Sequence, residues 1–491
     1  MRYSELVVFI IYLVAMLGVG VYFFFRSRGG EKEYFLGGRQ MGPWVSAFSA
    51  GASDMSAWVL MGLPASIYAF GMGQTWIAIG LAAGYILSWI FIAPRLRQFS
   101  IAANDSITIP QYLTNRFLAK SKVLQIICAA IFFAAYAVYA ASSLKACGTL
   151  FNTVLGIDAV LAMFIAAVII VGYTFLGGYK AVCWTDFIQG MLMLGALMIA
   201  PIFALILVQG GGASSSTVEF PANFWNFLSS GRMDWNSISD ILTGFGWGLG
   251  YFGMPHIIIR YMGIRSQKDV KKGAKIGITW NIIILVFAVA VGSIGRVFLG
   301  NISDSSTVFI TMVRIIFPGV ISGILLSAIL AAAMSTADSQ LLASASAFAS
   351  DVYKPVFRKN AKDKEMFWAG RIVVILISII AIIIAANPGS GTIMGLVGNA
   401  WGLFGAAFGP TILLSLFWKR FTFRGAIAGI VAGAIADVLW LAIPALAGTG
   451  LYEIIPGFAV GIAAAVIFTY TDKEPDEDVK ALFDRSVAMR D

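Results

Sequence analysis

The sequence predicts an all-α polytopic membrane protein with thirteen transmembrane helices. Of its 491 residues, 59% are hydrophobic and only 12% are charged, whereas a soluble domain carries about 25% charged residues. The apolar runs are continuous over about 20 residues, which is the length that a spanning helix needs, and they lack the alternation of β-barrel strands. We expect one membrane domain over residues 1–471, followed by a polar, solvated cytoplasmic tail over 472–491.

The apolar runs give the expected helices and leave mostly short connections between them. In chain order they are 5–25, 43–68, 74–94, 125–150, 158–178, 187–209, 239–261, 276–299, 319–349, 367–386, 393–418, 425–446 and 453–470. Within the connection 95–124, a short surface helix is expected to begin at Pro110, because proline suits the first turn of a helix. The connection 210–238 is predicted to be either a mobile lid or a lip at the interface.

The basic residues predict the orientation of the chain in the membrane. All but five of the 34 lysines and arginines fall on one side of the predicted topology, together with the connection 26–42. The five others are Arg2, Lys145, Arg232, Arg296 and Arg314. By the positive-inside rule this places the N-terminus outside and the C-terminus in the cytoplasm. The same distribution argues against nucleic-acid binding as the reason for the net charge of +9.

The sequence offers little that an enzyme would need. Its three cysteines lie in or beside apolar runs and show neither metal-ligand spacing nor a disulfide pattern. No phosphate-binding loop, nucleophile elbow or paired-histidine zinc motif is present. For the single histidine, His256, we expect a structural hydrogen bond.

The second predicted helix contains an ionisable residue at mid-membrane depth. Asp54 lies in the stretch Gly51–Trp58 and is flanked by serines, although a charged group costs at least about 2.5 kcal/mol there. Irregular backbone at that depth is tolerated where it lines a cavity or is buried in protein. We therefore expect this helix to unwind near Asp54 and to offer backbone carbonyls to a small charged ligand.

A second interruption is predicted in the seventh helix. Five glycines alternate with large residues between Gly244 and Gly253, and Pro255 follows. Small residues of this kind also serve close helix packing, and both interpretations stay open. Counted from the second helix, the seventh opens a second group of five with the opposite orientation, and matching breaks in inverted halves point to a transport site.

The ninth predicted helix adds hydroxyl and carboxylate groups. Ser335, Asp338 and Ser339 share a helical face, and Thr336 lies beside them. Hard cations prefer oxygen ligands, so carbonyls from the second helix and hydroxyls from the ninth predict a site for a monovalent cation. Asp186, at the predicted start of the sixth helix, suits either a helix cap or a cation route toward the cytoplasm.

These motifs identify a family resemblance that covers nearly the whole chain. The matching segments are 34–39, 49–56, 58, 60–64, 76–81, 184–186, 246–253, 255–256, 326–332, 334–336 and 450–457. They resemble the sodium/solute symporters, most closely the bacterial sodium/proline symporters. The resemblance implies a leucine-transporter-like 5+5 inverted repeat over helices 2–11, at about 43–418, with one additional helix before it and two after it.

The resemblance also implies roles for individual residues. The ligands of one sodium ion would be the carbonyls of Ala52, Met55 and Ala332 with the hydroxyls of Ser335 and Thr336. The solute would lie against Ser56, Trp58, Tyr139, Trp247, Tyr251 and Pro255. Asp54 would support sodium binding, Asp186 would belong to the inner ion route and Arg39 to the cytoplasmic gate.

Two positions depart from the pattern of the proline branch. Ala57 replaces a glycine beside Trp58, and Asp338 replaces a serine. Because some relatives carry a second sodium near these positions of the ninth helix, we hypothesise that Ser335, Asp338, Ser339 and Asp186 hold a second cation or share a proton. The stoichiometry of transport stays open on this evidence from sequence.

The sequence therefore predicts a multi-pass protein of the bacterial inner membrane that imports L-proline with co-transported Na⁺ by alternating access. Proline is a zwitterion whose carboxylate suits backbone amides freed at a helix break and whose ring suits aromatic walls. The alternatives are another small solute, such as a different amino acid, a carboxylate or a vitamin, and, in other classes, an ion channel or a transporter-like sensor. Apart from the lipid bilayer, no obligate protein partner is expected.

Overall fold

Helices form almost the whole of the molecule. The computed structural model describes residues 2–26, 31–211 and 218–489, and within these ranges it contains helices, turns and one isolated bridge between Met41 and Ile264. The predicted all-α class is confirmed, because each of the predicted apolar runs is helical over most of its length.

The helices fall into three groups by length and continuity. The long helices are α1 (Tyr3–Arg26), α8 (Val123–Leu155), α9 (Ala159–Gln209), α12 (Gln267–Leu299), α14 (Gly319–Ser346), α15 (Asp363–Ala386), α16 (Ile393–Phe417), α17 (Phe423–Ala442) and α19 (Ile454–Tyr470). The paired shorter helices are α3 (Pro43–Asp54) with α4 (Leu63–Phe70), α5 (Thr75–Leu87) with α6 (Ala93–Ala102), and α10 (Trp235–Leu249) with α11 (Pro255–Met262). The short helices are α2 (Glu31–Leu36), α7 (Ile109–Arg116), α13 (Val308–Ile316), α18 (Pro444–Ala447) and α20 (Glu477–Ala488).

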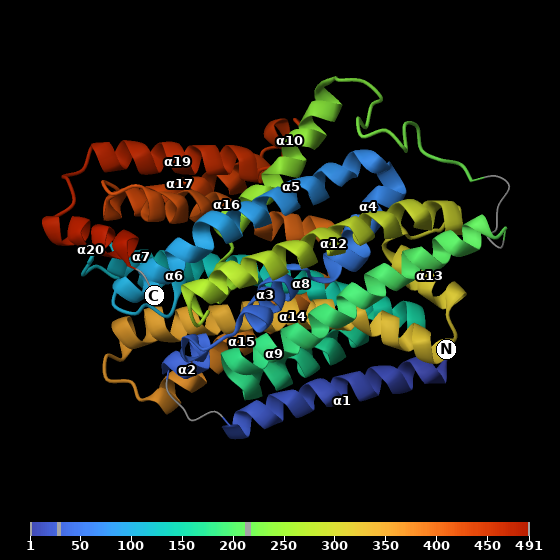
Figure 1. Ribbon diagram of the computed structural model, residues 1–491, viewed down its shortest axis with the longest axis horizontal. Coiled ribbons are helices and arrows are strands. Elements are labelled where there is room, and N and C mark those ends of the chain that lie inside the picture. The colour runs from blue at the N-terminus through green and yellow to red at the C-terminus, as the bar shows by residue number, and fades with distance from the viewer. Residues whose placement is uncertain (1, 27–30, 212–217, 490–491) are drawn as a thin grey trace.

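Most helices run along the long axis of the molecule, and the two termini lie at opposite ends of the bundle (Figure 1). Nine helices of the described residues are long and apolar enough to cross a membrane, and shorter apolar helices add to them. The chain is thus a multi-pass membrane protein. We call the end of the bundle that carries α2 and α20 the α20 end, and the end that carries α13 the α13 end.

Helix α14 occupies the centre of the bundle. It packs against α1, α3, α8, α9 and α15, and almost every residue from Ser322 to Ser346 is buried. A helix that is buried on all sides has no lipid-facing stripe, and the many alanines and serines of α14 allow its neighbours to approach closely. The polar groups at 335–339 are therefore buried against protein.

The structure corrects the predicted boundary between the fifth and sixth helices. Both lie in α9, which is broken at Gly178, where φ is 58°. Glycine adopts this left-handed conformation without a steric penalty, so the second half of α9 begins nine residues before the predicted position 187. Asp186 lies two turns inside this half and caps no helix, which removes the capping interpretation.

The C-terminal tail differs from its prediction. The tail contains α20, whose Phe483 is buried and meets Phe99 of α6 edge-on at 5.3 Å, so it is not simply a solvated terminus.

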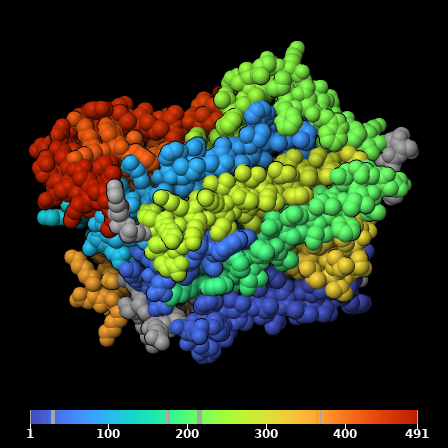
Figure 2. Space-filling model, in the orientation of Figure 1, coloured from blue at the N-terminus to red at the C-terminus, as the bar shows by residue number. Residues whose placement is uncertain are grey.

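Before α10, the described part of the connection 210–238 projects above the rest of the surface (Figure 2). Its Phe224 carbonyl accepts a hydrogen bond from the Met72 amide at 2.7 Å. This segment is therefore attached to the connection between α4 and α5. The surface helix expected at Pro110 is confirmed as α7, with Thr108 as its cap.

Glycines of α5 and α10 allow these two helices to touch through their backbones. A Cβ atom added at Gly80 would lie 1.8 Å from the Gly244 carbonyl oxygen. We expect Gly80→Ala to lower the melting temperature of the purified protein, because overpacking costs about 1–3 kcal/mol. At Gly195, a Cβ atom would meet nothing within 4 Å, so Gly195→Ala is the matched control. An equal melting temperature for both variants would contradict the close contact.

Candidate functional site

The helix break predicted near Asp54 is present. Helix α3 ends at Asp54, Met55 leaves helical geometry with φ −76° and ψ 72°, and a π-helical turn begins at Trp58. The break frees carbonyl groups, which accept hydrogen bonds from side chains of other elements. The Ser53 carbonyl lies 3.1 Å from His256 Nε2, which gives His256 the structural hydrogen bond expected from the sequence.

A hydroxyl group of α14 reaches the freed backbone of α3. Ser335 Oγ donates to the Ala52 carbonyl at 2.8 Å, and it lies 3.2 Å from the Ala332 carbonyl. The neighbouring Thr336 Oγ1 is buried and has no hydrogen-bond partner among the described residues. Met55, at the break itself, is fully buried. The Ser335 hydroxyl and the Ala52 and Ala332 carbonyls thus form a buried group of oxygen atoms of the kind that a small hard cation prefers.

The carboxylate of Asp54 links the two broken helices. Tyr251, in the one-turn helix between α10 and α11, donates its hydroxyl to Asp54 Oδ2. Asp54 Oδ1 is buried without a partner among the described residues. The Asp54 carbonyl accepts from Trp58 Nε1 at 3.1 Å and from the Tyr139 hydroxyl at 3.4 Å. The predicted aromatic residues Trp58, Tyr139 and Tyr251 thus meet around one residue of the break.

The second predicted break is also present, and its glycines serve close packing as well. Helix α10 ends at Leu249 and α11 begins at Pro255. A Cβ atom at Gly250 would lie 2.0 Å from Trp401 Nε1, so the glycine makes room for an indole ring. Both interpretations that the sequence left open are therefore correct.

Further aromatic rings stand behind this break, and the sequence analysis missed them. Trp401 of α16 donates to the Trp247 carbonyl at 2.8 Å, and Tyr452 stacks on the Trp247 ring at 5.0 Å. Trp247 therefore packs between α16 and the segment before α19. Ser56, at the break of the second span, is buried and its hydroxyl lies 3.4 Å from the Trp58 amide.

A buried ion pair lies on the α20 side of the oxygen atoms around Ser335. Asp186 Oδ2 accepts from Ser49 Oγ at 2.6 Å and lies 3.5 Å from Arg260 Nη2. Arg260 Nη2 also donates to Ser339 Oγ at 2.5 Å, and Ser339 Oγ lies 3.2 Å from Asp338 Oδ1. The structure thus brings Asp186, Asp338 and Ser339 together around Arg260.

Arg260 is the functional candidate that the sequence analysis did not single out. It sits at the edge of a predicted span, where it counted as one more cytoplasmic basic residue, yet only 1% of its surface is exposed. The available signal was its spacing of four residues from His256, which puts both side chains on one face of α11.

Arg39 ties several elements together at the α20 end. It adopts the left-handed conformation, with φ 54°, directly after Gly37 and Gly38. Its guanidinium donates to the Met262 carbonyl at 2.6 Å, to the Ser106 carbonyl at 2.8 Å and to Asp105 Oδ1 at 2.9 Å. Such a conformation is uncommon for a residue other than glycine, and these hydrogen bonds retain it. Arg39 therefore joins the turn after α2 to the end of α11 and to the connection after α6.

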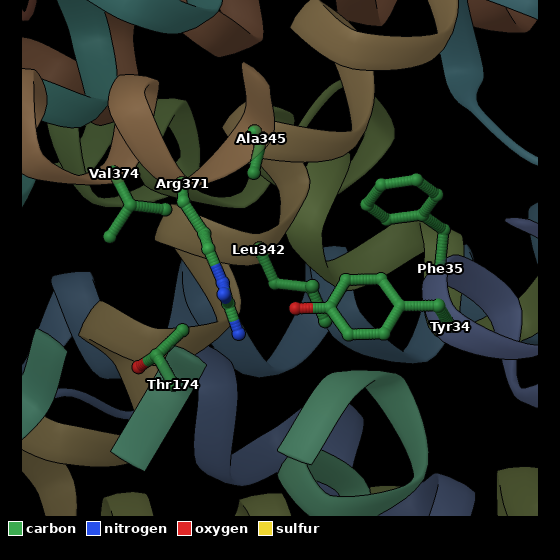
Figure 3. Close-up of a pocket in the computed structure, with 8 residues that line it drawn as sticks. Tyr34, Phe35, Thr174, Leu342, Ala345, Arg371 and Val374 are labelled. Carbon is green, nitrogen blue, oxygen red and sulfur yellow. The ribbon is translucent and has the colours of Figure 1, made fainter. Parts of the chain in front are cut away.

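A small pocket marks the same end, between α2, α9, α14 and α15 (Figure 3). Leu342 and Ala345 of α14 line it, one and two turns after Asp338, and the side chains of Tyr34 and Arg371 point toward each other across it. Its volume of about 20 Å³ leaves room for about one water molecule.

A larger cavity opens at the α13 end. It has a volume of about 430 Å³ and extends from Met61 and Gly62 to Asp304. A Cβ atom at Gly62 would lie 3.3 Å from Trp58 Cβ, so a residue that lines the cavity is next to Trp58. The α13 end thus carries a cavity of about 430 Å³, and a pocket of about 180 Å³ lies at the α20 end, where Glu33 and Tyr34 of α2 face Tyr179 and Lys180 of α9.

Asp105 allows a test of the contacts around Arg39. Burial opposes its ionisation, but hydrogen bonds and charges from Lys32 and Arg39 lower its pKa below 3.8. A lowered pKa means that the contact is complete above pH 3.8 and is lost as pH falls through the lower value in the folded protein. We expect Asp105→Asn to speed alkylation of the buried Cys183 by N-ethylmaleimide by about two- to fivefold, since the carboxylate is partly exposed and such pairs contribute little.

The labelling experiment has internal controls. Cys128 and Cys147 are the other free cysteines and are replaced by serine. Asp484→Asn breaks the exposed pair with Lys419, 2.6 Å long, and is expected to leave the rate unchanged. Without Asp105→Asn, the rate should be the same from about pH 6 to pH 8, because the pKa of Asp105 lies well below that window. Equal rates for the two aspartate variants would show that the contact between Asp105 and Arg39 does not control access to Cys183.

Comparisons with known proteins agree with this architecture. The sequence profile of the sodium:solute symporter family matches residues 34–433. The high-affinity proline transporter PutP of Bacillus subtilis is 41% identical over 95% of this chain and 98% of its own length. The sodium/proline symporter of Escherichia coli is 40% identical over 97% of this chain and 95% of its own length.

A solved structure supports the fold independently. A Na⁺-coupled sialic acid symporter, in a substrate-bound outward-open state, superposes with a TM-score of 0.78 at 22% identity. The superposition covers 96% of this chain and 99% of that one. At this level of identity, the likeness concerns the arrangement of the helices.

Proposed function

Because the chain belongs to the sodium:solute symporter family, we propose that it imports L-proline together with Na⁺ by alternating access. It is a transporter and not an enzyme. The observation that carries the ion part of the proposal is the Ser335 hydroxyl on the freed Ala52 carbonyl, 2.8 Å away. The choice of proline is supported by the names of relatives that are about 40% identical over nearly the full length.

One sodium ion would bind where the second span is broken. Its ligands would be the carbonyls of Ala52, Met55 and Ala332 and the hydroxyls of Ser335 and Thr336. The buried Thr336 Oγ1, which has no partner among the described residues, supports this assignment. A buried hydroxyl without a partner costs about 1–3 kcal/mol of stability, and a bound sodium ion would provide that partner. Sodium would join α3 to α14.

The solute would lie on the other side of the same break. Ser56, Trp58, Tyr139, Tyr251, Trp247 and Pro255 would enclose it. The apolar ring of proline suits aromatic walls, and its ammonium group would be attracted to a ring face. The Asp54 carboxylate, joined to Tyr251, would transmit sodium binding to the solute pocket. A bound ion that orders this region reduces the ordering cost of the solute, which is a form of coupling.

The orientation follows from charge. We infer that the α20 end faces the cytoplasm of a bacterial inner membrane, with the N-terminus outside, because the basic connections gather at that end. Arg39 would then belong to the cytoplasmic gate and the 430 Å³ cavity would be the outer entrance. The paired breaks support two inverted five-helix repeats within a total of thirteen spans.

Uptake by purified protein in proteoliposomes tests the proposal. Labelled proline should accumulate when a sodium gradient is imposed, more strongly with an inside-negative potential, since about 2.3 kcal/mol per charge is available from 100 mV. A proton gradient alone should give no accumulation. Sodium-driven uptake of another amino acid, a carboxylate or a vitamin in place of proline would overturn the choice of solute, and current without solute would favour a channel.

A further inference from the structure

Arg260 presents a permanent positive charge in the core of the bundle. Its side chain enters from α11 and is 1% exposed. Three oxygen-bearing side chains from three other segments surround it: Ser49 Oγ at 3.0 Å from Nε, Ser339 Oγ at 2.5 Å and Asp186 Oδ2 at 3.5 Å from Nη2. The Tyr179 ring lies below it, 5.0 Å from the guanidinium carbon.

The Arg260 pocket lies one helical turn from the proposed sodium ligands. Ser339 follows Ser335 by four residues on α14, and Ser49 precedes Ser53 by four on α3, whose Ser53 hydroxyl donates to the Ser49 carbonyl at 2.6 Å. Residues four apart lie on the same helix face. The interface between α3 and α14 therefore contains two successive oxygen clusters, one at Ala52–Ser335 and one at Ser49–Ser339.

The second cluster has the composition of a cation site. A carboxylate and two hydroxyls, with the Asp338 carboxylate adjacent to Ser339, are ligands that a hard monovalent ion accepts. In this chain a guanidinium occupies the cluster. A further cation there would meet a fixed positive charge at contact distance, and like charges repel strongly where water is scarce.

We propose that Arg260 is a tethered cation that fills a second ion site and thereby sets the coupling at one Na⁺ per solute. The inference rests on the proposed sodium-coupled transport and specifies its stoichiometry. It replaces the hypothesis from sequence that Ser335, Asp338, Ser339 and Asp186 hold a second mobile cation. A charge that is part of the protein returns with the protein in every transport cycle, so it does not add to the number of sodium ions moved per solute.

The test removes the charge and counts ions. Equilibrium binding of radioactive ²²Na⁺ to purified protein should give one ion per transporter in the unmodified chain and two in Arg260→Gln. In proteoliposomes, the charge moved per proline should rise from one to two in the same variant. Arg260→Lys keeps a positive charge in the pocket and should retain one ion, which separates charge from side-chain shape.

A double variant guards against a folding defect in Arg260→Gln. Arg260→Gln with Asp186→Asn removes both members of the buried pair, and it should bind one ion, because the second site then lacks the carboxylate that faces the guanidinium. The melting temperature adds a second readout. Replacing choline in the buffer with sodium should raise the melting temperature of Arg260→Gln more than that of the unmodified protein.

The outcomes are distinct. One ion in Arg260→Gln, or equal stabilisation by sodium in both proteins, overturns the tethered-cation proposal. Two ions in Arg260→Lys would also overturn it. The unmodified protein provides the separate check on transport: if it shows no sodium-driven proline uptake, the proposed function fails, whereas normal uptake with an unchanged ion count in the variants removes only this inference.

Discussion

Replacement of Ser335 by alanine is expected to raise the sodium concentration for half-maximal proline uptake by about 10- to 100-fold. The change removes a buried hydroxyl that bridges the Ala52 and Ala332 carbonyls. A contact between a charge and a hydrogen-bonding group contributes about 1.5–3 kcal/mol, and every 1.4 kcal/mol is tenfold in affinity. In Ser335→Ala the bound ion loses one such oxygen ligand.

Variants of Thr336 and Ser327 provide a second test and a control for this prediction. Thr336→Val keeps the shape of the side chain and removes only its oxygen, so it should weaken sodium in the same direction, whereas Thr336→Ser should preserve affinity. Ser327 lies on the same helix but donates only to the Gly323 carbonyl one turn away, at 2.8 Å. Ser327→Ala should leave the sodium dependence unchanged. A similar shift in Ser327→Ala and Ser335→Ala would show that α14 packing, not ion ligation, is being measured.

The sequence was most informative where chemistry conflicts with the bilayer. Asp54 and the serines beside it predicted the break at Met55 because a charge in an apolar span requires local protein surroundings. The hydroxyls at 335 and 336 predicted the facing partner. The contact between them, however, depends on how α3 packs against α14, and no pattern within either segment contains that distance.

Long-range partners account for what was missed. Arg260 was counted among the cytoplasmic basic residues because the end of a span is uncertain by several residues. Its burial depends on Asp186 and Ser339, which lie far away in the chain. Gly178 breaks α9 without a polar connection, so the predicted gap at 179–186 was too long. The apolar face of α20 is short and lies beside acidic residues, which hid its packing on α6.

Removal of the Tyr251 hydroxyl is expected to lower kcat/KM for proline by about 10- to 150-fold, because a hydrogen bond to a charged group contributes about 1.5–3 kcal/mol. In Tyr251→Phe, Asp54 would lose the donor on Oδ2 while Oδ1 already lacks a partner among the described residues. The link between the two helix breaks would be lost, and both proline and sodium should bind more weakly.

Tyr85→Phe is the matched control, since Tyr85 packs edge-on against Tyr251 at 5.2 Å and its buried hydroxyl has no described partner. Initial rates of uptake at several sodium concentrations are measured for Tyr251→Phe, Asp54→Asn and the double variant, which complete a double-mutant cycle. If the hydroxyl acts through the carboxylate, the losses of the two single variants are not additive. Additive losses, or an equal loss in Tyr85→Phe, would contradict the coupling contact.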